Sequence, residues 1–308
     1  MKRIAMLVAV LSIALCATVQ SSGQSGQQNA PATGPTTPAG QTAPAQAAPA
    51  PQGKRPPQAK TDPEFNAYKA AAATTDAAAL EKAADDFATK FPDSELRLLL
   101  YKATMRTYQS QNNGDKTEAM GRKVLGLDGD DPEALVIVAE VIAEKTRDSD
   151  LDKDQRYDEA MKMAQKATQT VETDVAVGQN TPQEKIDAYK SLLRSNAYSI
   201  LGTIDFKKDN FVSAQENLQK SIDAYPAQPD PVVVLRLALA LDKQAAALSS
   251  DKQAAKYTDA LKVANRAVEL TPENTQIGSL ARRERDRLTQ LTGGAATPAQ
   301  PTAQPPKN

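Results

Sequence analysis

The chain has 308 residues, of which 37 are Lys or Arg and 38 are Asp or Glu, so its formal net charge is −1. This balance excludes the clustered basic surface that nucleic-acid binding needs, and we expect no nucleic-acid partner. The sequence has no His, and its single Cys is Cys16, which excludes His-based catalysis and an internal disulfide bond. Since glycine-rich phosphate loops and nucleophile elbows are also missing from the sequence, we expect neither an enzyme nor a cofactor.

Residues 1–21 have the pattern of an export signal. Lys2 and Arg3 form a short positive start, and the run that follows is almost entirely apolar. The apolar run has the length of a secretory signal and is short for a membrane span. We therefore expect export to the periplasm or cell envelope, with cleavage after Ala17 or Ser21.

Cys16 leaves alternatives open at this signal. Ile13 and Ala14 fit the motif that precedes a lipidated Cys in bacterial lipoproteins, whereas Leu15 stands where that motif has a small residue. A lone Cys in an apolar run otherwise behaves as one more hydrophobic residue. We expect membrane contact only through this N-terminal segment, if it is retained uncleaved or lipidated at Cys16.

The middle of the chain differs in composition from both flanks. Residues 22–60 are rich in Pro, Ala and Gln and contain no acidic and no large apolar residue, and residues 293–308 are of the same kind. Such segments bury too little apolar surface to offset their ordering entropy, so we predict a disordered linker and a disordered tail. Residues 61–292 are rich in helix-forming residues and are predicted to form the folded domain.

The clearest local pattern lies at residues 195–228. Small and large apolar residues recur there at helical spacing in two runs, which predicts a helix to about Lys207, a turn at Asp209 and Asn210, and a second helix from Phe211. Gly202 and Ala214 would let these helices approach closely. The residues that carry the pattern are Tyr198, Leu201, Gly202, Phe211, Ala214, Leu218 and Pro226.

This pattern resembles the tetratricopeptide repeat, a helical hairpin with a period of 34 residues. Weaker copies cover most of residues 61–291, and the copy at 95–128 has the poorest match, with a shortened second helix through Val124. The resemblance is to repeat proteins of the exported bacterial type. It implies an all-α solenoid of helical hairpins, closed by a C-terminal capping helix from about Glu273 to Leu291. We expect the insertion at 173–194 to extend the helix that follows it.

The resemblance also implies a function and a site. In such proteins the first helix of each repeat lines a concave face that binds a peptide or a helix, which makes this chain a protein–protein interaction scaffold. Two alternatives remain open for the carried-over positions: an exposed groove, or burial as core. The positions are Leu99, Ala103, Val136, Glu140, Ser199, Thr203, Val233 and Leu237.

A second motif supports an alternative function. Residues 87–94, with the sequence FATKFPDS, are similar to repeats in periplasmic and outer-membrane assembly proteins. This similarity favours a structural or assembly component of the bacterial cell envelope. Lipidation at Cys16 would anchor such a component to a membrane.

An acidic stretch offers one alternative metal site. Asp148, Asp150 and Asp152 occupy alternate positions, and Glu159 follows at the distance of the last ligand in an EF-hand calcium loop. Lys153, however, stands where that loop needs Gly for its sharp turn. We predict a solvated loop and no bound metal, with Asp148, Asp150 and Asp152 as the alternative ligands.

Overall fold

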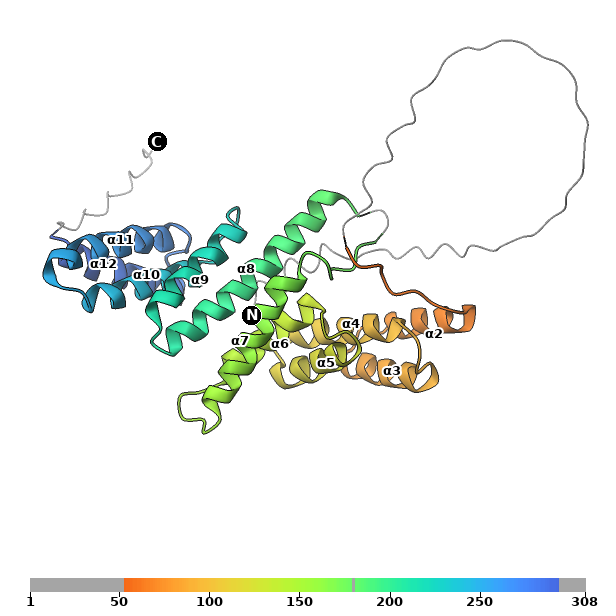
Figure 1. The fold of residues 1–308 in the computed structure, drawn as a ribbon. Helices are drawn as coiled ribbons and strands as arrows, with labels where there is room; N and C mark the ends of the chain where they lie inside the picture. The colour runs from red at the N-terminus through yellow and green to blue at the C-terminus, as the bar shows by residue number, and fades with distance from the viewer. Residues whose placement is uncertain (1–52, 179–180, 294–308) are drawn as a thin grey trace, which may run out of the picture.

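The computed structural model describes residues 53–178 and 181–293. Within these ranges the chain forms eleven α-helices, and its single element of β pairing is an isolated bridge between Lys54 and Ala176. The all-helical class predicted from the sequence is therefore confirmed. Figure 1 shows the helices following one another from α2 at one end of the molecule to α12 at the other.

The helices have the following bounds: α2 Asp62–Ala72, α3 Ala77–Lys90, α4 Leu96–Ser110, α5 Gly114–Leu127, α6 Pro132–Lys145, α7 Lys153–Thr170, α8 Gln183–Lys207, α9 Phe211–Ala224, α10 Pro231–Ala246, α11 Ser250–Glu269 and α12 Gln276–Leu291.

Three of these helices begin with the same short signal. In α2, α6 and α10 a Pro lies in the first turn, one or two residues after a capping residue, which is Thr61, Asp131 or Asp230. Asp131 Oδ1 accepts a hydrogen bond of 2.9 Å from the Ala134 amide, and Asp230 Oδ1 accepts one of 2.8 Å from the Val232 amide. These caps satisfy amides that have no partner within the helix, and Pro has no amide to satisfy there.

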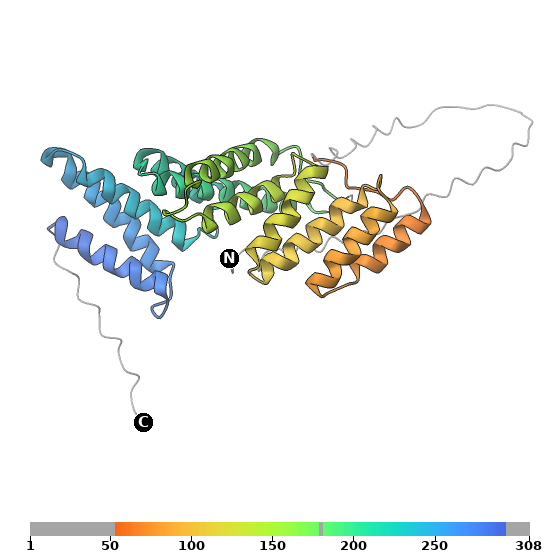
Figure 2. The ribbon, with the colours of Figure 1, turned by 90° about the horizontal axis from the view of Figure 1, so that it is seen from below.

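Consecutive helices pack against each other along the whole array. In addition α2 contacts α4, α6 contacts α8, and α10 contacts both α8 and α12. Ion pairs from α4 to α6 complete the series of neighbours. Helices α2, α4, α6, α8 and α10 thus lie side by side, and we call them the A layer (Figures 1 and 2).

The helices of the α8–α9 hairpin approach each other closely. Leu201, Ala214 and Leu218 are buried between the two helices, which meet at Gly202. α9 begins at Phe211, as predicted, and ends two residues before Pro226. Where the repeat pattern usually has an aromatic residue, Asp205 is buried and accepts a hydrogen bond of 2.8 Å from Asn217.

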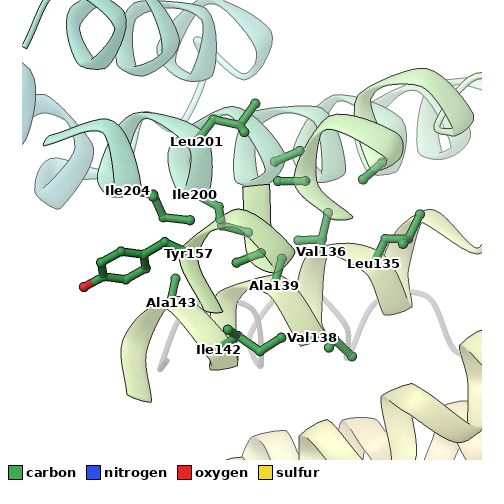
Figure 3. Packing of buried hydrophobic residues seen from close by; sticks show 14 residues of the cluster. Leu135, Val136, Val138, Ala139, Ile142, Ala143, Tyr157, Ile200, Leu201 and Ile204 are labelled. Carbon is green, nitrogen blue, oxygen red and sulfur yellow. The ribbon is translucent and has the colours of Figure 1, made fainter. Parts of the chain in front are cut away.

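The central core joins α6, α7 and α8. Tyr157 of α7 lies fully buried among small and branched side chains of all three helices, as Figure 3 shows. Its neighbours in α7, Ala160 and Ala164, have no exposed surface, so the helix backbones approach closely. The low aromatic content of the chain therefore goes with a core in which alanine sets the interhelical distance.

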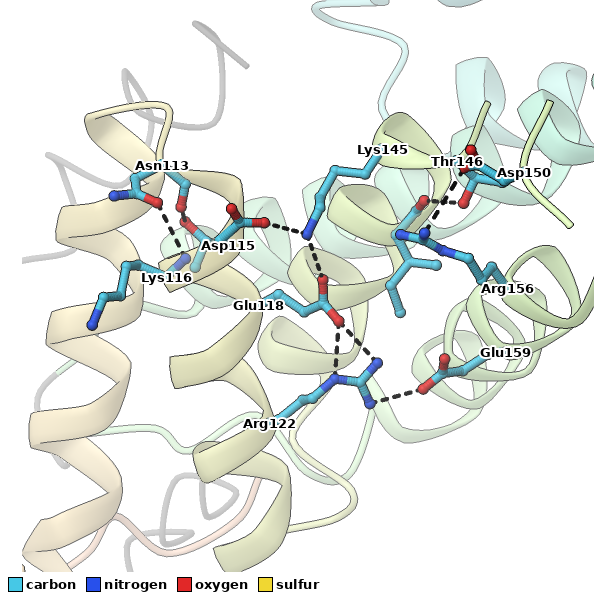
Figure 4. A network of polar contacts seen from close by, with 12 residues as sticks. Asn113, Asp115, Lys116, Glu118, Arg122, Lys145, Thr146, Asp150, Arg156 and Glu159 are labelled. Carbon is cyan, nitrogen blue, oxygen red and sulfur yellow. Dashed lines mark hydrogen bonds and ion pairs between the residues drawn. The ribbon is translucent and has the colours of Figure 1, made fainter. Parts of the chain in front are cut away.

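A chain of ion pairs covers α5, α6 and α7 on the surface (Figure 4). Lys145 pairs with Asp115 and Glu118, and Arg122 joins Glu118 to Glu159 at 2.8 Å. These side chains are largely exposed to solvent, where each such pair contributes less than about 1 kcal/mol. These ion pairs contribute more to which helices lie next to each other than to the free energy of unfolding.

The last residues of the predicted linker, 53–60, make specific contacts with the folded part of the chain. Arg55 pairs with Glu95 at 2.7 Å, and Lys54 pairs with Asp128 at the same distance while its backbone bonds to residues 175 and 177. Pro57 is buried. Residues 53–60 are therefore held on the helices, because basic residues within a Pro-rich stretch find carboxylates on α4 and after α5.

Two helix boundaries also differ from the prediction. α5 is not shortened: it runs through Leu127 and has 14 residues, as many as α9. The last helix begins at Gln276, where Thr275 accepts a hydrogen bond of 3.0 Å from the Gly278 amide and so caps the helix. The extension of α8 back to Gln183 agrees with the prediction.

Candidate functional site

Three of the eight predicted groove residues lie in the core. Val136 is 1% exposed, Val233 is 3% exposed and Leu237 is 2% exposed. Val136 packs with α7 and α8, and the other two pack with α9 and α11. The sequence left two alternatives open, an exposed groove or burial in the core. These three positions are buried, because their apolar side chains on α6 and α10 pack against neighbouring helices.

The other five predicted residues are partly exposed on the A layer. Leu99 and Ala103 lie on α4, Glu140 lies on α6, and Ser199 and Thr203 lie on α8. They come from three successive helices of that layer. This set is small and mostly polar, whereas the three buried positions are all apolar.

Arg236 on α10 belongs with this set, although the sequence analysis missed it. Its Nη1 donates a hydrogen bond of 2.8 Å to Thr203 Oγ1. No carboxylate among the described residues forms an ion pair with it. Burial lowers the pKa of Arg236, and the charge of Asp230 offsets this only in part. A guanidinium has five N–H donors, so most of its hydrogen-bonding capacity is unused here.

Lys207, near the end of α8, lies on the same side as Arg236. Its Nζ donates a hydrogen bond of 2.8 Å to the Ala143 carbonyl and lies 5.3 Å from the centre of the Tyr157 ring. Burial lowers the pKa of Lys207, and the positive charge of Arg236 lowers it further. The carboxylates of Glu144 and Asp148 act on the pKa of Lys207 in the opposite direction, so this ammonium lies between charges of both signs.

Glu140 is the negative counterpart on α6. It makes no hydrogen bond and no ion pair with any residue that the structure describes. Burial raises the pKa of Glu140 to about 7, and the neighbouring negative charge of Glu144 contributes. Burial disfavours the charged form of a carboxyl group, so this group ionises only near neutral pH.

This unpaired carboxylate makes stability depend on pH. Because the pKa of Glu140 is about 7 in the folded chain and lower in the unfolded chain, folding retains a proton, and stability falls as pH rises from about 4.5 to 7. We expect Glu140→Gln to raise the free energy of unfolding by about 1 kcal/mol at pH 8 and to change it little at pH 4.5. Urea unfolding at both pH values measures this.

The matched control for this prediction is Glu273→Gln, at an exposed position before α12. Exposed substitutions change stability by less than about 0.5 kcal/mol, so the control should be nearly neutral at both pH values. An equal gain for Glu140→Gln at pH 4.5 and pH 8 would contradict the assigned titration.

A second group of charges between α4 and α6 is fully paired. Arg106 binds Glu133 through two bonds of 2.5 Å, and Lys102 binds Asp131 at 2.6 Å and Glu133 at 3.0 Å. Glu133 and Asp131 are both buried. These four residues satisfy each other, so this end of the A layer offers a partner little unused charge.

Side chains of the acidic loop between α6 and α7 contact neighbouring residues of the chain. No group of three or more His, Cys, Asp or Glu among the described residues is arranged to hold a metal ion. Asp150 instead accepts a hydrogen bond of 2.9 Å from the Arg147 amide. Leu151 at the loop tip is fully exposed. Asp148 and Asp152 flank this turn without converging on a common point.

Two predictions fall outside the structural description. Cys16 and the whole signal segment precede residue 53, and the tail follows residue 293. In the part of the chain that is described, none of the helices has the length and apolar character needed to cross a membrane.

Comparison with known proteins adds no relative. A scan against models of protein families finds no match to this chain, and a search of curated proteins finds no match either. The proposals that follow therefore rest on the residues and geometry described above.

Proposed function

We propose that this protein is an exported, non-catalytic scaffold that binds a segment of another protein on its A layer. The proposed architecture is a solenoid of tetratricopeptide-type hairpins capped by α12. A repeated arrangement supports this architecture. Each helix of the A layer packs against the next helix in the chain and also lies beside the next helix of the layer. The proposed export rests on the sequence of residues 1–21.

The observation that carries this proposal is the row of partly exposed side chains along the A layer. Leu99, Ala103, Glu140, Ser199 and Thr203 come from three neighbouring helices. They combine small apolar surface with hydroxyl and carboxylate groups, which suits a protein segment that needs both contact area and hydrogen bonds. Repeat proteins that stack helical hairpins present extended surfaces of this kind.

Affinity capture tests the proposal. The full chain serves as bait against extract of its own source cells, beside a variant with Ala103→Arg and Ser199→Arg, which places large cations on the A layer. We expect a protein that the unaltered chain retains to be lost from this variant by at least tenfold, because a buried like charge or a steric clash costs more than about 1.4 kcal/mol.

The control for this capture is Val212→Arg, which adds the same side chain on α9, where Val212 is 62% exposed. This control should retain the partner. Equal capture by all three baits would move the interface away from the A layer. No specific capture by any of them would favour the structural envelope role instead.

A further inference from the structure

The A layer carries two charged side chains of opposite sign, on α6 and α10, that form no ion pair with a residue that the structure describes. Glu140 on α6 has Glu144 as its neighbour in the next turn, and Arg236 on α10 has Lys207 nearby on α8. The hydroxyl groups of Ser199 and Thr203 on α8 belong to the helix between α6 and α10. The carboxylate of Glu140 on α6 and the guanidinium of Arg236 on α10 therefore lie on opposite sides of α8 in the layer.

The two charges cannot be explained as a stabilising pair. No ion pair joins Glu140 to Arg236 in the structure, whereas Asp131 and Glu133 in the same layer are joined to Lys102 and Arg106 of α4. Asp230, at the start of α10, acts on both groups, raising the pKa of Glu140 and opposing the lowering at Arg236. An unpaired, partly buried charge costs stability, so each of these groups is arranged to gain from an external partner.

We propose that the A layer binds an extended protein segment in one direction, with a basic side chain at Glu140 and an acidic side chain at Arg236. This inference rests on the proposed function and adds the charge pattern and polarity of the occupant. Helices pack about 8–10 Å apart, so α6 and α10 are separated by roughly 16–20 Å. An extended segment rises about 3.3 Å per residue, so the two charged residues should be about five or six positions apart.

Thr203 contributes to the selection of an acidic group at α10. Its hydroxyl already accepts a hydrogen bond from Arg236, so its own proton remains free to donate. The guanidinium is thereby held in place before the ligand arrives, which reduces the entropy lost on binding.

Peptide selection tests the inference with the full chain. A phage library of random 12-residue peptides is selected on the unaltered protein and on a charge-swapped variant with Glu140→Arg and Arg236→Glu. We expect the unaltered protein to enrich peptides with one basic and one acidic residue about five positions apart, in one order. The swapped variant, shown by circular dichroism to be folded, should enrich the reverse order.

A second measurement covers the case in which the swapped variant does not fold. The affinity of one peptide selected on the unaltered protein is measured against Glu140→Gln and against Arg236→Gln. Each substitution should weaken binding by about tenfold or more, because it removes one partner of a charge-assisted contact. Gln residues at the charged positions of the peptide should abolish most of this difference.

Each outcome decides between the two proposals. Peptides that lack the charge pattern, or that bind both Gln variants as tightly as the unaltered protein, would overturn the charge inference and leave the scaffold function in place. Selection of no peptide at all, together with a negative capture experiment, would overturn both. The predicted pattern with its reversal would support both.

Discussion

Glu133→Gln is expected to lower the free energy of unfolding by about 3–5 kcal/mol, since it breaks a buried ion pair and leaves Arg106 without its carboxylate partner. Glu133 is 3% exposed and binds both Arg106 and Lys102. For a folded part of this size, the loss corresponds to a melting temperature lower by about 10 °C or more. Differential scanning calorimetry at pH 7 measures it.

The pH dependence of this loss identifies its cause. The neighbouring cations Arg106 and Lys102 outweigh the effect of burial and lower the pKa of Glu133 below its usual value. The ionised pair therefore stabilises the fold above about pH 4.5, and that contribution disappears as pH falls through the lowered pKa. The difference between the unaltered chain and Glu133→Gln should shrink in acid.

Two controls separate burial from ion pairing. Lys82 and Asp86 form an equally short pair of 2.5 Å, but both side chains are mostly exposed. Asp86→Asn should cost less than about 0.5 kcal/mol. A double variant with Arg106→Met and Glu133→Met should recover part of the stability lost in Glu133→Gln, because no charge is left alone. A large effect of Asp86→Asn, or no effect of Glu133→Gln, would contradict this account.

The sequence predicted the α8–α9 hairpin because its signals are local. The small residues at Gly202 and Ala214, and the turn at Asp209, lie at the spacing that closes two helices on each other. In the structure Asp209 has a φ of 58°, which Asp tolerates better than most residues, and α9 begins two residues later. Here side-chain volume and turn chemistry point to one conformation.

The α4–α5 hairpin has a similar turn, although its sequence matches the repeat pattern poorly. Its turn residue Asn112 has a φ of 57°, and a 14-residue helix again begins two residues later. The large and small residues are exchanged across the interface, with Met105 on the first helix facing Gly121 on the second. The summed side-chain volume of the facing pair is similar in the two hairpins, although each single position departs from the pattern. A comparison position by position therefore gave this copy a poor match.

The candidate site could be predicted only in part, because one sequence does not show how successive hairpins stack. The stacking of successive hairpins decides whether Val136 or Leu237 faces a neighbouring helix or the solvent. An apolar helix face has the same residue types in both cases. Arg236 could have been recognised, because it is the only charge in the apolar run from residue 231 to 241. A charge in such a run either meets a partner or lies at a surface that binds one.

Gly202→Ala is the second large effect, and its sign is opposite to that of the same substitution elsewhere in the chain. A Cβ at Gly202 would lie 2.6 Å from Leu218 Cγ and 2.9 Å from the Leu218 backbone nitrogen. The backbone atom cannot move without shifting α9, so the helices must separate. We expect a loss of about 2 kcal/mol or more, after allowing for the higher helix propensity of Ala, and a lower melting temperature by about 4–8 °C.

Gly126 is the matched control, because it lies inside α5 with no atom within 4 Å of the position of an added Cβ. Gly126→Ala should raise the free energy of unfolding by about 0.5–1 kcal/mol, since Ala loses less backbone entropy than Gly in a helix. Thermal unfolding of both variants gives the comparison. If Gly202→Ala were also stabilising, the space between α8 and α9 would hold an added methyl group. Close approach of the two helices would then not explain the small residues of the repeat pattern.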